Sequence, residues 1–216
     1  MKSDTQLRKD VIAELNWDPA VAADAVGVAV KDGVVTLSGH LGTYIEKAAV
    51  QRALRRVAGV KAIALELDVR LAPDHHRSDT DIATAAQTVL RANASVPAGR
   101  IRLIVDKGWI TMQGDVDWDY QRRSAEHALR PLAGVVGINN EVEIKTPVAS
   151  SNVERGIREA LARQAEREAK HIEIQVDGST VRLRGRVHSW QERDAAQGAA
   201  WSAPGVRTVL NELMIG

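Results

Sequence analysis

One stretch of sequence occurs three times along this chain, at residues 32–69, 107–144 and 177–215. The repeated glycines are Gly39, Gly114 and Gly185, followed by Gly59, Gly134 and Gly205. Both series step by 75 positions from the first copy to the second (114 − 39 and 134 − 59) and by 71 from the second to the third (185 − 114 and 205 − 134). A constant spacing through strand-like and helix-like segments indicates three copies of one small folding unit.

Glycines, small residues and apolar periodicity repeat in these copies, whereas the polar residues between them differ. Catalysis requires a particular nucleophile, acid or base in a particular place, and no such residue recurs. We therefore expect no catalytic residue, no cofactor and no enzymatic activity. A metal-dependent enzyme is the remote alternative.

The 216 residues divide into three units, at 1–71, 77–146 and 150–216. Units of about 70 residues are close to the lower limit for an independent core, so each is expected to lean on its neighbours or on other molecules. The chain has no Phe, two Tyr and five Trp, and this composition predicts cores built from aliphatic side chains.

Charge and cysteine content exclude several classes of function. The net charge is +1, and Lys+Arg against Asp+Glu number 10 and 9 in residues 1–71, 9 and 10 in 72–146, and 10 and 9 in 147–216. This balance argues against a nonspecific nucleic-acid binder. The absence of cysteine excludes disulfides and thiolate metal sites.

The amino terminus is charged and lacks the apolar core of a signal peptide, and no stretch approaches the ~20 apolar residues of a membrane span. As written, the sequence predicts a cytoplasmic protein without a transmembrane segment. A periplasmic protein whose signal had been removed would give the same pattern, so the compartment stays open.

Each unit is predicted to have the order α-β-β-α-β, an α/β (α+β) fold with a three-stranded sheet and two helices on one face. Capping residues start the first helices at Ser3 or Asp4, Ser78 or Asp79, and Ser151 or Asn152. The predicted hairpin turns are Asp32-Gly33, Lys107-Gly108 and Asp177-Gly178, and the second helices span roughly 44–57, 119–132 and 190–202. Short linkers at Leu71–Arg77 and Thr146–Ser151 predict a compact or curved row of units.

The unit resembles the BON domain, a family named after bacterial osmotically inducible periplasmic and nodulation proteins. The residues that carry the resemblance are Gly39, Glu46, Ala53, Gly59 and Val60, then Gly114, Gln121, Ala128, Gly134 and Val135, then Gly185, Glu192, Ala199, Gly205 and Val206. The family's last-strand asparagine is present as Asn140 and Asn211, whereas the first unit has Leu65 there. The resemblance implies a role in envelope maintenance or osmotic stress, with binding at phospholipid surfaces, and supplies no catalytic residue.

Three local motifs imitate known sites without meeting their requirements. Asp115, Asp117 and Asp119 have calcium-loop spacing, but the glycine required at the sixth position is replaced by Tyr120. The Gly39–Gly42 segment reads as the GxxG clamp of RNA binders, which belongs between two helices and not after a strand. His75 and His76 are adjacent in a charged linker, so we expect no metal site.

Three arginines, Arg182, Arg184 and Arg186, point to the open face of one predicted strand. Phosphate binding is one interpretation of this pattern. Cross-strand ion pairs with Glu173 and Asp177 are the interpretation that we favour.

An aromatic residue recurs beside cations where each second helix begins. The candidate contact residues are Tyr44, Lys47, Trp118, Tyr120, Arg122, Arg123, Trp190 and Arg193. Aromatic and cationic side chains together suit a membrane interface or a protein interface. The sequence therefore predicts a non-enzymatic binding or scaffold protein that contacts an anionic phospholipid surface, or alternatively a protein-protein adaptor. Packing of the aromatics against a neighbouring unit explains the pattern equally well, and the sequence leaves the ligand and the oligomeric state open.

Overall fold

The computed structural model describes residues 2–145, 153–164 and 172–215. The first unit contains α1 (Asp4–Trp17), β1 (Val26–Lys31), β2 (Val34–Leu41), α2 (Tyr44–Arg56) and β3 (Ala62–Val69). The second contains α3 (Asp79–Ala92), β4 (Ile101–Asp106), β5 (Trp109–Val116), α4 (Asp119–Leu129) and β6 (Gly137–Ile144). The third contains α5 (Val153–Gln164), β7 (Ile172–Asp177), β8 (Thr180–Val187), α6 (Trp190–Trp201) and β9 (Thr208–Ile215). Two short 3₁₀ turns, η1 (Ala23–Ala25) and η2 (Pro73–His75), precede β1 and follow β3.

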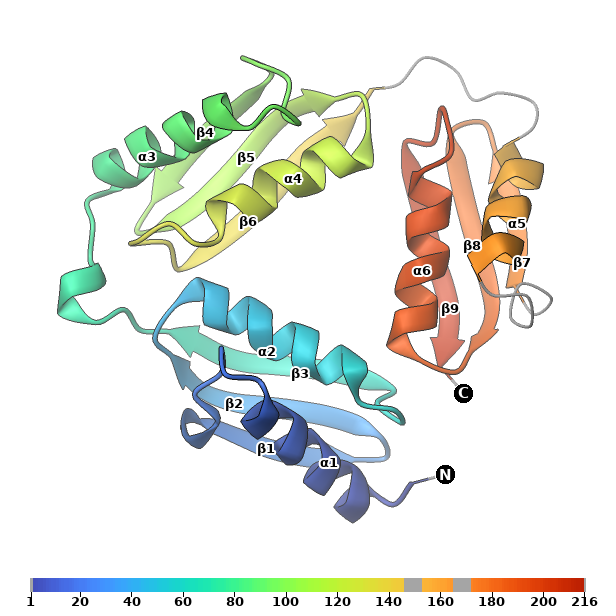
Figure 1. The fold of residues 1–216 in the computed structure, drawn as a ribbon, viewed down its shortest axis with the longest axis horizontal. Coiled ribbons are helices and arrows are strands. Elements are labelled where there is room, and N and C mark those ends of the chain that lie inside the picture. The colour runs from blue at the N-terminus through green and yellow to red at the C-terminus, as the bar shows by residue number, and fades with distance from the viewer. Residues whose placement is uncertain (1, 146–152, 165–171, 216) are drawn as a thin grey trace.

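Every unit has the same sheet, with the second strand in the centre. The first strand pairs with it antiparallel and the last strand parallel, and the second helix forms the crossover between the parallel strands. Both helices of a unit cover one face of its sheet (Figure 1). The predicted fold class and the three-fold repetition are therefore confirmed.

The hairpin turns of the first two units are held by a carboxylate from the first helix. Asp32 and Gly33 both have positive φ, as a two-residue hairpin requires, and Asp4 accepts hydrogen bonds from their amides at 2.7 and 3.0 Å. Asp79 does the same for Lys107 and Gly108, at 2.8 and 2.9 Å. The first residue of each helix thus fixes the turn of its hairpin.

The third hairpin differs from the prediction by one residue. Asp177 pairs with Thr180, so the turn is Gly178-Ser179 instead of Asp177-Gly178. The aspartate belongs to the strand because the third copy places its glycine one position earlier than the other copies do. The predicted cap at Ser151 or Asn152 lies outside the described residues, whereas Ser3 and Ser78 cap α1 and α3.

The three hydrophobic cores are built mainly from aliphatic side chains, in agreement with the composition. Fully buried examples are Val11, Leu37 and Leu54 in the first unit, Ile82, Met112 and Leu129 in the second, and Ile157, Leu183 and Ala200 in the third. Each set forms its own cluster, so every unit has a hydrophobic core of its own.

The units form a closed group of three, which the prediction of a row did not include. Their second helices α2, α4 and α6 face the middle of the molecule (Figure 1). The third unit contacts the first, and an ion pair between Arg55 of α2 and Asp194 of α6 at 2.7 Å joins them. All three units therefore take part in the packing between units.

We predict that Gly114→Ala lowers the free energy of unfolding by about 3 kcal/mol, because the glycine has a φ of +128° and an added Cβ would lie 2.0 Å from the Arg100 carbonyl oxygen. Gly99→Ala is the matched control, since Gly99 also has positive φ but opens onto free space, and its cost is about 1 kcal/mol. Urea titration of both variants measures the difference. Equal losses would show that the strained contact at Gly114 is unimportant.

Candidate functional site

The first residue of each second helix occupies an equivalent position: Tyr44, Asp119 and Trp190. Thr43 caps α2 by accepting from the Glu46 amide at 3.2 Å, and Ser189 caps α6 by accepting from the Glu192 amide at 3.1 Å. These caps fix where each helix begins and therefore where its first side chain points.

Trp190 joins the third unit to the first. Its indole Nε1 donates a hydrogen bond to the Val60 carbonyl oxygen at 2.9 Å, and its ring packs against the core of the first unit. The ring is flanked by two guanidinium groups, with Arg193 5.2 Å and Arg55 5.8 Å from its centroid. A hydrogen bond, apolar contact and cation–π stacking thus act together at this junction.

Tyr44 joins the first unit to the second. Its ring packs against the core of the second unit, and its hydroxyl lies near the backbone of Ile138. Burial, with a smaller contribution from Glu126, raises the pKa of the Tyr44 hydroxyl, while the nearby Arg130 opposes this shift. The side chain is therefore a neutral, anchored aromatic at any physiological pH.

The second unit contacts the third through a cation at a helix start and an aromatic ring at a helix end, the reverse of the other two junctions. Asp119 is 2% exposed and is held by ion pairs with Arg122 and with Arg123, the latter at 2.7 Å without hydrogen-bond geometry. Arg122 in turn lies 4.8 Å above the ring of Trp201, the last residue of α6. Here the helix start supplies the cation and the neighbouring helix end supplies the aromatic.

All three junctions join the start of one second helix to the carboxyl-terminal end of another. Arg55, Arg130 and Trp201 correspond in the repeat, at the carboxyl-terminal ends of α2, α4 and α6. Each meets the entrance of another unit's second helix, with Arg55 beside Trp190, Arg130 beside Tyr44, and Trp201 beside Arg122. The recurring aromatic and cationic residues therefore hold the three units together.

Two other predicted contact residues bind the last strand of their own unit. Lys47 donates to the Leu67 carbonyl oxygen at 2.8 Å. Arg193 donates to the carbonyl oxygens of Asn211 and Leu213 at 3.0 and 3.2 Å. These cations are engaged by backbone oxygens and support the crossover between second helix and last strand.

The entrance of α4 has the exposed members of the predicted set. Tyr120 is 54% exposed, the Arg123 side chain is 61% exposed, and Trp118 is half-buried. Contact of these residues with a lipid or protein partner stays a prediction. Sequence reasoning missed Arg55, Arg130 and Trp201, although their shared position in the repeat was a usable signal.

The acidic motif of the second unit is an ion-pair cluster. Arg100 binds both Asp115 and Asp117, and Lys145 lies 3.7 Å from Asp115. The hydrogen bond from Arg100 lowers the pKa of the Asp115 carboxyl below its ordinary value. Within residues 2–145, 153–164 and 172–215, no group of three His, Cys, Asp or Glu side chains is arranged to hold a metal ion.

The arginines of β8 have a different partner from the predicted one. Arg182 and Arg184 both bind Glu212 of the parallel neighbour β9, each at 2.7 Å. The prediction of ion pairs with Glu173 and Asp177 was therefore wrong. Glu173 lies opposite Arg184, but its carboxylate accepts from Gln175 at 2.9 Å, and Asp177 lies beside the turn.

Among the helices that the structure describes, none is both long enough and apolar enough to cross a bilayer.

Comparison with known proteins gives one family and several distant structures. The sequence matches the BON domain at residues 3–70, 78–146 and 149–216. Osmotically-inducible protein Y of Escherichia coli (strain K12) is 24% identical over 146 residues, covering 66% of this chain and 73% of that protein. The C-terminal domain of CdsD, from the Type III secretion system of Chlamydia trachomatis, has a TM-score of 0.27 at 15% identity, with full coverage of both chains. The PrgH periplasmic domain has a TM-score of 0.22 at 12% identity, covering 88% of this chain and 95% of that one. At these scores neither structure informs the arrangement of the units.

We predict that Trp190→Ala lowers the free energy of unfolding by about 2 kcal/mol, because it removes an aromatic anchor from the junction between the third and first units. The variant should also have a larger radius of gyration in small-angle X-ray scattering. Trp17→Ala is the control, since Trp17 is 83% exposed and its loss should cost within about 0.5 kcal/mol. An unchanged radius for Trp190→Ala would mean that the junction is dispensable.

A second prediction concerns acid stability. Because the pKa of Asp115 is depressed in the folded state, its stabilising effect is present above the ordinary value of 3.8 and is lost as pH falls through the lower folded value. Asp115→Asn should therefore flatten the fall of the urea midpoint below pH 3.8. The exposed Asp106→Asn is the control, and calorimetry of wild type should detect no calcium binding. A curve for Asp115→Asn that matches wild type would contradict this account.

Proposed function

Because the chain belongs to the BON domain family, we propose that it is a non-enzymatic binding protein that acts in osmotic-stress or envelope physiology through protein partners. The domains of this protein are residues 1–71, 77–146 and 150–216. The name of the relative, osmotically-inducible protein Y, supports the physiological setting. Cell fractionation distinguishes a cytoplasmic from a periplasmic location.

The protein-partner assignment rests on the contacts that the aromatic and cationic residues make between units of the same chain. Trp190 donates a hydrogen bond to Val60, and Tyr44 packs against the core of the second unit. Arg122 forms an ion pair with Asp119 and lies over the Trp201 ring. A tryptophan held in this way cannot enter a headgroup layer unless the junction opens. The surfaces that remain open include the uncovered sheet faces and the strand edges, which suit protein recognition.

The absence of repeated polar chemistry supports a binding role. Asp115 and Glu212 have pKa values below their ordinary ones, because a hydrogen bond from Arg100 or from Arg184, respectively, stabilises each carboxylate. Such carboxylates are satisfied structural groups and poor general bases. The shifts therefore support ion-pair roles for these two residues.

A phospholipid surface is the second candidate, favoured by the α4 entrance. Tyr120 and Arg123 are both exposed and lie three residues apart on α4, close in sequence to the half-buried Trp118. An interfacial aromatic and a cation can bind anionic headgroups, at about 1 kcal/mol for each cation near the surface. With a net charge of +1, such binding would be weak and would decrease with salt.

Flotation with vesicles separates the two candidates. We expect wild type to stay out of the floating fraction with both phosphatidylglycerol and phosphatidylcholine vesicles. We also expect Tyr120→Ser plus Arg123→Gln to complement a deletion strain in high-osmolarity medium as well as wild type does. Trp17→Ser controls for the loss of an exposed aromatic. Flotation of wild type with phosphatidylglycerol, lost together with complementation in the double variant, would replace the protein-partner proposal by the lipid one.

A further inference from the structure

A groove between the first helix and the edge strand occurs at equivalent positions in the first two units. In the first unit it is a cavity of about 200 Å³ between α1 and β1. In the second unit it is a cavity of about 510 Å³ between α3 and β4. The lining positions match with a step of 75 residues, so the two cavities are versions of one feature.

In the first unit an arginine closes this groove. Arg8 of α1 donates from its Nε to the Val28 carbonyl oxygen at 2.9 Å. Val28 lies in β1, which is an edge strand, and the bond comes from the side opposite β2. A cation placed over an edge strand prevents another strand from pairing there.

The second unit lacks this closure. Ala83 and Gln87 stand at the positions of Arg8 and Ile12, and Leu103 stands at the position of Val28. In the part of the chain that the structure describes, no side chain donates to the Leu103 carbonyl oxygen. Because alternate residues of an antiparallel edge strand direct their backbone groups outward, Ile101 and Val105 offer outward groups as well.

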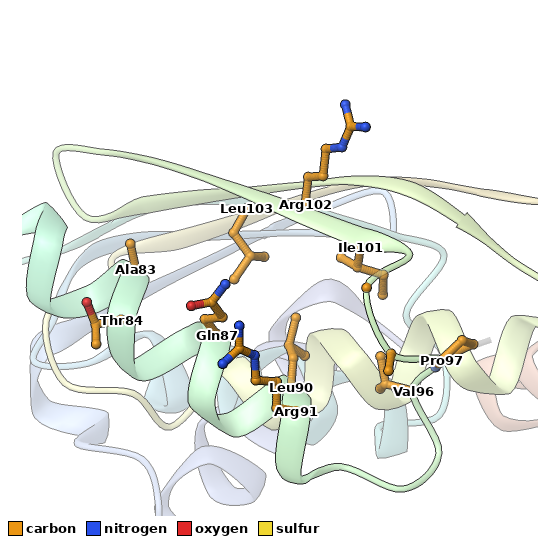
Figure 2. Close-up of a pocket in the computed structure, with 12 residues that line it drawn as sticks. Ala83, Thr84, Gln87, Leu90, Arg91, Val96, Pro97, Ile101, Arg102 and Leu103 are labelled. Atoms are coloured by element: carbon orange, nitrogen blue, oxygen red, sulfur yellow. The ribbon is translucent and has the colours of Figure 1, made fainter.

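The cavity has an apolar floor and cationic margins. Figure 2 shows the side chains of Leu103 and Ile101 hanging from the strand toward Leu90 of α3, with Val96 and Pro97 at one end. Arg91 lies on the helix side, whereas Arg102 points away on the opposite face of the strand (Figure 2). Within the described ranges, neither arginine has a carboxylate partner, and no Asp or Glu lines the cavity.

We propose that the β4 edge and this cavity bind an extended segment of a partner protein, with alternating apolar and acidic residues, as an added strand. The peptide backbone pairs with Ile101, Leu103 and Val105. An apolar peptide side chain enters the cavity against Leu90 on the helix side, where Arg91 adds positive charge at the margin. The alternate acidic side chains lie on the opposite face of the sheet and meet Arg102. Backbone pairing supplies affinity in this binding mode, and the pocket and charges supply specificity. The inference rests on the proposed protein-binding function and locates its site.

The charges favour an acidic peptide over a second copy of the chain. Two β4 edges paired with each other would bring both Arg91 and both Arg102 side chains to one junction. Like charges placed across a strand pair are destabilising. An acidic strand gains from the same arginines.

The test uses the difference between the units. A phage-displayed library of short random peptides is selected on the full chain, and the enriched peptides are synthesised and titrated by fluorescence anisotropy. We expect apolar residues at alternate positions with Asp or Glu between them. Ala83→Arg, which installs the closure of the first unit, should weaken binding by about tenfold or more. Arg91→Glu plus Arg102→Glu should weaken it and reduce its salt dependence.

Ala85→Arg is the matched control, because Ala85 is an exposed residue of the same helix outside the cavity lining. This variant should bind the peptides as wild type does. Bound peptide should also slow hydrogen exchange at the Leu103 amide, which a binding site elsewhere would not do. Circular dichroism with thermal unfolding verifies that each variant is folded.

The inference would be overturned by the absence of any enriched peptide or by equal binding of wild type and Ala83→Arg. A concentration-dependent dimer that Ala83→Arg abolishes would make a second copy the occupant and would also overturn it. Vesicle flotation that Ala83→Arg abolishes would assign the groove to lipid and overturn it as well. Flotation that depends on Tyr120 and Arg123, with peptide binding still lost in Ala83→Arg, would refute the proposed function and leave the groove assignment standing.

Discussion

The contact between the entrance of one second helix and the end of another is the interaction on which the whole arrangement depends. The Trp190 indole, bonded to Val60 and stacked between Arg55 and Arg193, returns the third unit to the first. Without that return, the third unit would contact the second through Arg122 and Trp201 but would not reach the first. With it, each unit covers part of a neighbour's core, which compensates for its small size.

Aromatic side chains that pack one unit against another are also withheld from outside partners. Aromatic side chains are scarce in this chain, and two of them, Tyr44 and Trp201, pack against the core of the second unit from the two neighbouring units. Residues used in this way are not available to an outside partner. We therefore expect recognition at the sheet faces and strand edges that the junctions leave open.

Much of the fold could be predicted from the sequence because it depends on local periodicity. Serine caps, alternating strands and glycine positions define the order α-β-β-α-β without knowledge of tertiary contacts. The turn at Gly178-Ser179 was missed because the third copy shifts its glycine by one position. The partner of Arg182 and Arg184 was missed because two strands flank β8, and sequence alone does not say which carboxylate a long side chain will reach.

Contacts between units were the harder part of the candidate site. The sequence identified the aromatic and cationic residues but could not choose between an outside partner and a neighbouring unit. That choice depends on the relative placement of the units, which no periodic pattern encodes. The reversed pair of Arg122 and Trp201 was hidden because the aromatic lies in a different unit from its cation.

The junctions between the three units are head-to-tail. Each helix start meets a different surface, a helix end, so the contact is heterologous and the three units form a pseudo-cyclic trimer within one polypeptide. Separate subunits with such contacts form rings or open fibres according to whether the rotation closes, and their assembly depends on concentration. Here the covalent links keep the units at a high effective concentration, so modest junction energies suffice to close the ring at any dilution.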